Sequence, residues 1–182
     1  SQGLMAVFPS FAKEYLGVTD VFVINAVIGA SGIGIAIGSL IYSKISKHYI
    51  EIGTIPFSAL GMALMIYVST IVQTPFLLGM SFLVFGIFGG LFVVPLNALI
   101  QFNAKKKVLG TILAGNNWFH SLAMFLMLAL TTTVSFYDLD PLNTLYLILL
   151  ITVIGTSYTI YKLPQSLILL FLKRIVGLKY KL

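Results

Sequence analysis

The 182-residue sequence contains no cysteine, only two histidines and only five acidic residues. The absence of cysteine excludes a disulfide framework, thiolate metal sites, thiol catalysis and cysteine palmitoylation. So few histidines and acids leave no metal-ligand cluster and no pair of carboxylates at a plausible catalytic position. The sequence therefore predicts that this segment is not an enzyme and needs no metal or cofactor.

Charge is scarce as well, because charged residues make up 9% of the chain and hydrophobic residues 59%. A soluble domain carries about 25% charged residues, and a disordered chain is rich in charge and poor in apolar residues. Both classes are excluded, and an integral membrane protein remains. The net charge of +6 then indicates basic cytoplasmic loops rather than a nucleic-acid partner.

Long apolar runs predict an all-α fold with six membrane-spanning helices. Strands of a membrane barrel would be about 10 residues long and would alternate strictly, whereas these runs are nearly continuous. The first run is short for a span, which fits a chain cut from a longer protein. The predicted spans are residues 1–16, 21–42, 52–72, 76–102, 108–136 and 143–163 of a domain over 1–163, and a basic tail over 164–182 follows.

The basic residues predict the orientation of these spans. Only Lys13 lies on one side of the alternating spans, together with Glu14, Asp20, Asp138 and Asp140. By the positive-inside rule, both ends of this multi-pass segment are expected in the cytoplasm. The other side holds Lys44, Lys47, Lys105, Lys106, Lys107, Lys162, Lys173, Arg174, Lys179 and Lys181.

Small residues and prolines interrupt the apolar runs. Ala30, Gly34 and Gly38 recur at intervals of four, which predicts close packing against another helix. Gly86, Gly89 and Gly90 precede Pro95, where a kink is expected. That kink is either ordinary curvature or a hinge in a helix that lines a cavity.

Two groups of polar side chains lie at membrane depth. Asn97 and Gln101 are four residues apart, and Asn116, Asn117 and His120 share the next span. Asn97 and Asn116 lie about 12 to 14 Å from the same lysine loop at 1.5 Å per residue, so neighbouring spans would bring them together. The groups are either hydrogen-bonding contacts between helices or contacts for a substrate headgroup.

Several segments resemble the major facilitator superfamily of transporters. The stretch from Gly38 to Lys47 resembles the superfamily's loop between helices eight and nine, and the stretch from Phe88 to Gln101 resembles helix ten of its lysophospholipid transporter family. Residues 12–17 and 50–53 are also similar to that family. The resemblance implies one half of a twelve-helix bundle, built as a 3+3 inverted repeat, with the N-terminal half as its partner.

The resemblance also implies a substrate. The chain would move lysophospholipid inward across a bacterial inner membrane to the cytoplasmic leaflet, with Asn97, Gln101, Asn116, Asn117 and His120 as headgroup contacts. The tail resembles the junction to a fused acyltransferase domain that reacylates the lipid, or else it is a basic segment lying on anionic lipid. Two alternatives are an exporter of small amphipathic compounds on the same fold and a non-transporting anchor for the acyltransferase.

Overall fold

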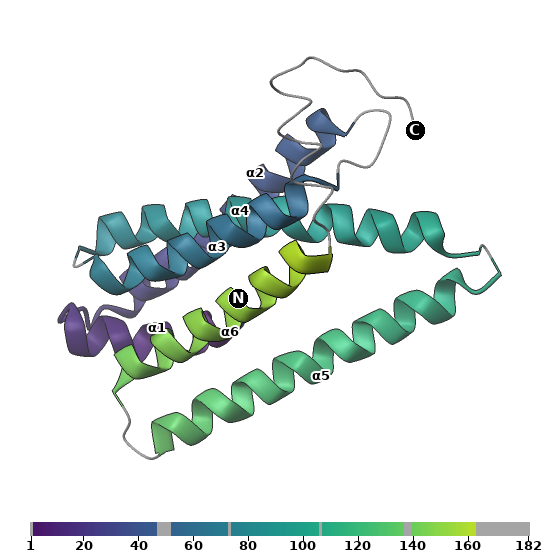
Figure 1. Cartoon of the computed structure of the whole chain (residues 1–182). Coiled ribbons are helices and arrows are strands. Elements are labelled where there is room, and N and C mark those ends of the chain that lie inside the picture. The colour runs from purple at the N-terminus through teal and green to yellow at the C-terminus, as the bar shows by residue number, and fades with distance from the viewer. Residues whose placement is uncertain (1, 47–51, 73, 106, 137–139, 163–182) are drawn as a thin grey trace.

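The computed structural model describes residues 2–46, 52–72, 74–105, 107–136 and 140–162, and these form a helical bundle (Figure 1). Each helix coincides with one of the six apolar runs and ends within three residues of its expected limits. The basic tail and the loop residues Lys47, Lys106 and Asp138 lie outside the described residues. The helices are α1 (Gln2–Tyr15), α2 (Val21–Ile45), α3 (Thr54–Ile71), α4 (Pro75–Asn103), α5 (Leu109–Phe136) and α6 (Pro141–Lys162).

Five of the six helices, α2 to α6, are long and apolar enough to cross a membrane. The helix α1 has 14 residues, fewer than the roughly 20 that a full span needs. The structure therefore confirms six helices and five candidate spans. The helix α4 runs unbroken through Pro95, and Pro56 lies in the first turn of α3, where a missing N–H costs no helical hydrogen bond.

The closest helix contact joins α2 and α4, which run parallel to each other. A Cβ atom added to Gly34 would overlap the Leu83 carbonyl oxygen, and one added to Gly86 would overlap the Ser31 carbonyl oxygen. Gly38 lies equally close to the carbonyl oxygen of Ile87. We call this contact the glycine seam, and its residues are Ser31, Gly34, Gly38, Gly86 and Gly90.

The prediction of a close-packed stripe on α2 is confirmed, but its members differ slightly from those expected. The buried positions are Ser31, Gly34 and Gly38, whereas Ala30 is only half-buried. A Cβ atom added to Gly29 would meet no atom within 4 Å. The seam therefore uses the side of α2 that faces α4, and the neighbouring small residues face away.

An apolar core lies where α1, α3, α4 and α6 meet. Phe8 on α1 and Phe82 on α4 are nearly fully buried, with ring centroids 4.8 Å apart. Leu145 on α6 and Ile66 on α3 close the same cluster. On the α3–α6 contact, the Thr156 hydroxyl donates to the Ala59 carbonyl oxygen at 3.3 Å, so it is satisfied away from water.

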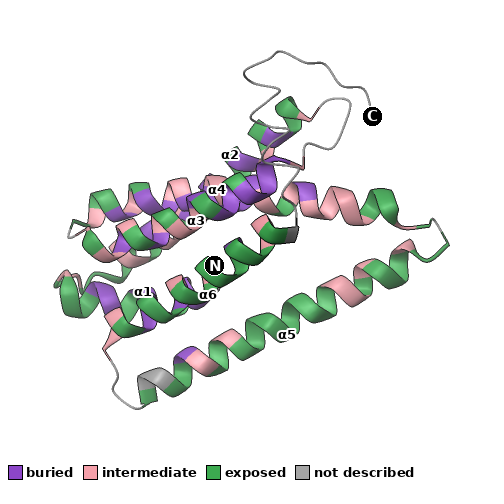
Figure 2. Ribbon diagram, viewed as in Figure 1, coloured by how far each residue is buried: buried purple, intermediate pink, exposed green. Residues whose placement is uncertain are grey.

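The helix α5 lies at the edge of the bundle (Figures 1 and 2). No residue in the most apolar stretch of α5 is buried. Among the described side chains of the whole helix, only that of Thr131 is buried. The helix contacts α1 and α6 by its C-terminal half, where the Met127 side chain packs against Gly3. Its large apolar side chains, such as Trp118 and Phe125, are exposed and available to lipid or to another part of the protein.

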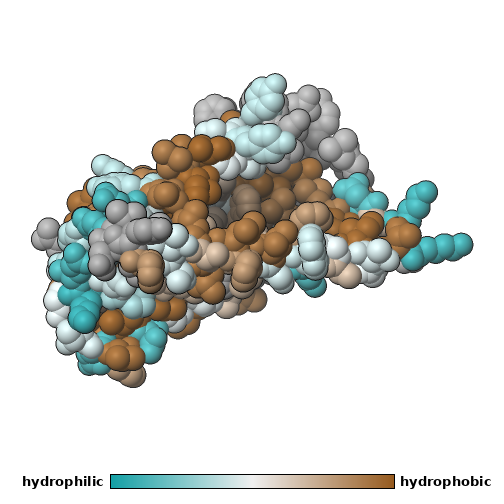
Figure 3. Space-filling model, turned by 90° about the horizontal axis from the view of Figure 1, so that it is seen from below, coloured by the Kyte–Doolittle hydropathy of each residue, from teal (hydrophilic) through white to brown (hydrophobic). Residues whose placement is uncertain are grey.

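Polar residues gather at the two ends of the bundle, and apolar surface spans the middle (Figure 3). At the end expected outside the cell, Asp140 accepts hydrogen bonds from the Tyr15 hydroxyl at 2.6 Å and from the Leu142 N–H at 2.9 Å. The same carboxylate thus caps the start of α6 and ties it to the end of α1.

The predicted orientation can be tested with single cysteines, since the chain has none of its own. We expect a cysteine at position 138 to react with an impermeant maleimide in intact cells, because the acidic loop should face outward. A cysteine at position 106 should react only after the membrane is permeabilised, because the lysine loop should face the cytoplasm. Labelling of position 106 in intact cells would reverse the orientation.

Candidate functional site

The polar residues of α4 lie near the end of that helix which follows Pro95. Asn97 is half-buried and Gln101 is exposed. Asn97 stands seven residues, or two turns, after the seam residue Gly90, so it lies on the side of α4 that packs along α2. Gln101 follows one turn later on that side. The two side chains therefore continue the line of the glycine seam toward the lysine-rich end.

The polar residues of α5 lie on a different part of the bundle. Asn116 is half-buried, whereas Asn117 and His120 are exposed. The helices α4 and α5 contact each other only marginally, so the described chain does not bring Asn97 and Asn116 together. A shared cluster of the α4 and α5 groups stays a prediction for the complete protein.

None of these five side chains makes a hydrogen bond within the described part of the chain. The amide of Asn103, by contrast, donates to the Leu99 carbonyl oxygen at 2.9 Å and is satisfied by its own helix. Amide groups without partners at membrane depth are costly, so they are expected to face another helix, water or a ligand. The five residues thus present unused hydrogen-bonding groups, on α4 beyond the glycine seam and along α5.

Tyr42 is a further polar residue that the sequence analysis missed. Its side chain is 3% exposed, and its hydroxyl is buried without a hydrogen-bond partner among the residues that the structure describes. Tyr42 follows Gly38 by four residues, so it extends the buried stripe of α2 along α4. The same spacing that predicts the stripe would have found it, had the stripe been followed one turn further.

Tyr42 and Asn97 therefore lie on the facing sides of α2 and α4, where the glycine seam ends. One contributes a hydroxyl and the other an amide, which together offer donors and acceptors but no charge. Lys44 and Lys105 stand at the ends of the same two helices and supply positive charge there. No three His, Asp or Glu side chains gather to hold a metal in the part of the chain that the structure describes.

The molecule belongs to the class of multi-pass helical membrane proteins. Its helices are long and apolar, its surface is mostly apolar, and two of the helices carry amides without partners among the described residues. Comparison with known proteins adds one relative. The chain is similar to the lysophospholipid transporter LplT of Photorhabdus laumondii, with 29% identity over 124 residues. That match covers 65% of this chain and 30% of the transporter.

No family model matches the chain, and no solved structure matches it. The similarity to a transporter agrees with the prediction that this segment is not an enzyme. The matched part is less than a third of the transporter's length, so the activity of the complete relative comes to this chain only as a proposal.

Proposed function

We propose that this chain is one half of a twelve-helix transporter of the major facilitator superfamily that moves lysophospholipid inward across a bacterial inner membrane. The observation that carries the proposal is the similarity to a lysophospholipid transporter over most of the six-helix segment. The inward direction would deliver the lipid to the cytoplasmic leaflet for reacylation. The residues that contact the headgroup are Asn97, Gln101, Asn116, Asn117 and His120, joined by Tyr42.

The pairing of the helices supports the half-transporter proposal. In an inverted repeat, α1 would correspond to α4, α2 to α5 and α3 to α6. Under this exchange the α2–α4 contact corresponds to the α5–α1 contact, and the α3–α4 contact corresponds to the α6–α1 contact. The α3–α6 contact maps onto itself. Such an exchange is expected of a 3+3 inverted repeat, which is a common plan of transporter halves.

The exposure of α5 supports a partner for this half. In the exchange of helices, α5 corresponds to α2, yet α5 packs on α1 far less than α2 packs on α4. An N-terminal six-helix half of the same protein would cover the exposed side of α5 and complete the transport pathway. Alternating access would then arise from rocking of one half against the other.

The experiment that tests the proposal is uptake of labelled lysophospholipid into liposomes. We expect the full-length protein to take up lysophospholipid and the isolated 182-residue chain to take up none, because one half supplies only one wall of the pathway. A small amphipathic amine serves as the control substrate. Transport of the amine in place of the lipid would favour an exporter, and transport by neither protein would favour a membrane anchor.

Uptake by the isolated chain would contradict the half-transporter proposal. Insertion of the isolated chain into the liposomes is verified separately by protease protection, so that a lack of uptake cannot be due to a lack of inserted protein.

A further inference from the structure

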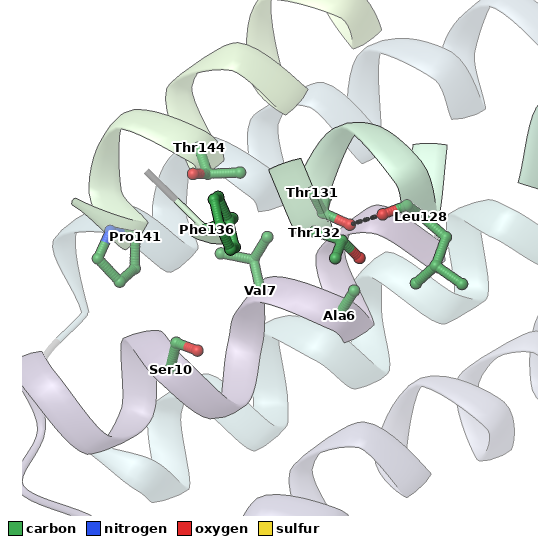
Figure 4. Close-up of a pocket in the computed structure, with 9 residues that line it drawn as sticks. All are labelled: Ala6, Val7, Ser10, Leu128, Thr131, Thr132, Phe136, Pro141 and Thr144. Atoms are coloured by element: carbon green, nitrogen blue, oxygen red, sulfur yellow. Dashed lines mark hydrogen bonds between the residues drawn. The ribbon is translucent and has the colours of Figure 1, made fainter. Parts of the chain in front are cut away.

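A cavity of about 550 Å³ lies between α1, α5 and α6, near the end of the bundle that carries Asp140 (Figure 4). This volume is within the range of about 300 to 1,000 Å³ that is typical of small-molecule sites. The cavity is separate from the amides of Asn97 and Asn116, because none of the five predicted contact residues lines it. Its walls come from all three helices, and four of its lining side chains carry hydroxyls: Ser10, Thr131, Thr132 and Thr144.

The hydroxyls form one layer of the cavity. At 1.5 Å per residue, Thr144 lies about 4.5 Å from the start of α6, and Thr131 and Thr132 lie about 6 to 7.5 Å from the end of α5. Ser10 lies about 7.5 Å from the end of α1 by the same rise. Three helices thus place hydroxyls at similar depth below the polar end of the bundle.

An apolar layer lies deeper in the same cavity. Leu128 stands about 12 Å from the end of α5, and Val7 and Ala6 stand about 12 to 13.5 Å from the end of α1. All three are aliphatic. From the bundle end inward, the cavity is therefore lined first by the apolar Pro141 and Phe136, then by the hydroxyl groups, and deepest by hydrocarbon.

Thr144 shows that the hydroxyl layer has unused hydrogen-bonding capacity. Its side chain is 4% exposed and lines the cavity, yet its hydroxyl has no hydrogen-bond partner among the described residues. Thr131, at the same level, satisfies its hydroxyl with the Leu128 carbonyl oxygen at 2.9 Å on its own helix. A ligand that enters the cavity and offers an acceptor to the Thr144 hydroxyl would therefore gain a hydrogen bond there.

The charges around the cavity restrict the chemistry of that ligand. Among the described residues no lysine or arginine lines the cavity, and the carboxylate of Asp140 stands directly before the lining residue Pro141. A phosphate group would therefore be repelled from the cavity and would stay in the water at its mouth. Neutral acceptors, such as ester oxygens, and hydrocarbon would be admitted.

From this layering we propose that the cavity binds a single-chain phospholipid from the outer leaflet, with the glycerol ester in the hydroxyl layer and the acyl chain against Ala6, Val7 and Leu128. The inference rests on the proposed function, since a lysophospholipid is the single-chain phospholipid that such a transporter would take up. It adds a site for the chain and the ester, distinct from the headgroup contacts on α4 and α5.

The first test fills the apolar layer in the full-length protein with Ala6→Phe. Equilibrium binding in nanodiscs is measured for a palmitoyl and a butanoyl lysophospholipid. The affinity for the palmitoyl lipid should fall about 10-fold, because the new ring occupies the place of the chain. The affinity for the butanoyl lipid should not change, because its chain ends above that layer. Equal effects on both lipids, or no effect on either, would overturn the proposal.

The second test removes the unused hydroxyl with Thr144→Val, which keeps the shape of the side chain. The wild-type protein should bind an ester-linked lysophospholipid about 2- to 10-fold more tightly than its ether-linked analogue, and the variant should lose that preference. The control is Thr133→Val, because the Thr133 hydroxyl donates to its own helix at Ala129 and lies outside the cavity. This variant should keep the preference.

These outcomes separate the cavity from the proposed function. If the wild-type protein binds the lipids as expected but transports none of them, the proposed function fails and the cavity stands. If the protein transports lysophospholipid but Thr144→Val keeps the ester preference, the proposed function stands and the site is wrong.

Discussion

Replacing Asn97 or Asn116 with leucine should lower the apparent affinity for lysophospholipid about 5- to 150-fold. If these amides contact the headgroup, leucine leaves the polar atoms of a bound substrate unpaired, at a cost of about 1 to 3 kcal/mol, and 1.4 kcal/mol corresponds to a factor of ten. Folding should suffer less, because neither amide makes a hydrogen bond within the described residues. The measurements are uptake by the full-length protein and its thermal stability in detergent.

The matched control for this experiment is Asn103→Leu on the same helix. The Asn103 amide is exposed and bonded to its own backbone, so its loss should leave uptake unchanged. Full uptake by both Asn97→Leu and Asn116→Leu would show that these residues are not the site. Loss of stability in step with uptake would instead show that the amides serve contacts between helices in the complete protein.

Substitution of Gly34 by alanine should destabilise the protein by about 1 to 3 kcal/mol, the usual cost of forcing extra volume into a packed interior. The added methyl group would overlap the Leu83 carbonyl oxygen, which belongs to the backbone of α4 and cannot turn aside as a side chain does. Gly86→Ala should have an effect of the same size, because it meets the Ser31 carbonyl oxygen from the other helix. Thermal unfolding of the purified protein measures both effects.

Gly29→Ala is the control for the seam, since Gly29 lies on the same helix but a Cβ atom there meets nothing within 4 Å. Alanine favours helix over glycine by about 1 kcal/mol, so this variant should be slightly more stable than the wild-type protein. Opposite signs for Gly34→Ala and Gly29→Ala would confirm the backbone contact. Equal shifts would show that helix propensity alone decides both.

The sequence was sufficient to predict the six helices, because each is a long apolar run bounded by polar or turn residues. Asp20 illustrates this, since it precedes the second run and accepts a hydrogen bond from the Phe22 N–H at 2.8 Å, as an N-cap residue does. The spacing of Gly34 and Gly38 likewise predicted a close contact. The spacing of apolar and small residues along a helix depends only on neighbouring positions in the sequence, so it can be recognised without knowing the tertiary structure.

The partners of each helix could not be predicted in the same way, because they depend on residues far apart in the sequence. The shared lysine loop suggested that α5 packs beside α4, yet α5 packs mainly on α1 and touches α4 and α6 only marginally. The seam contains Ser31 and not the expected Ala30, because α4 packs against the side of α2 on which Ser31 lies. The cavity at Thr144 is lined by residues of three helices, so no single stretch of the sequence could predict it. The five predicted headgroup contacts stay predictions.

The glycine seam also constrains how this sequence can vary. Every single-nucleotide change that replaces a glycine codon by another amino-acid codon introduces at least a Cβ atom. At Gly34 and Gly86 each such change meets backbone, so the damage cannot be relieved by one compensating side chain. A larger residue at either position would be accommodated only if α2 and α4 moved apart. Variants at Gly29 and Gly32 face open space and should accumulate freely in laboratory evolution of this protein.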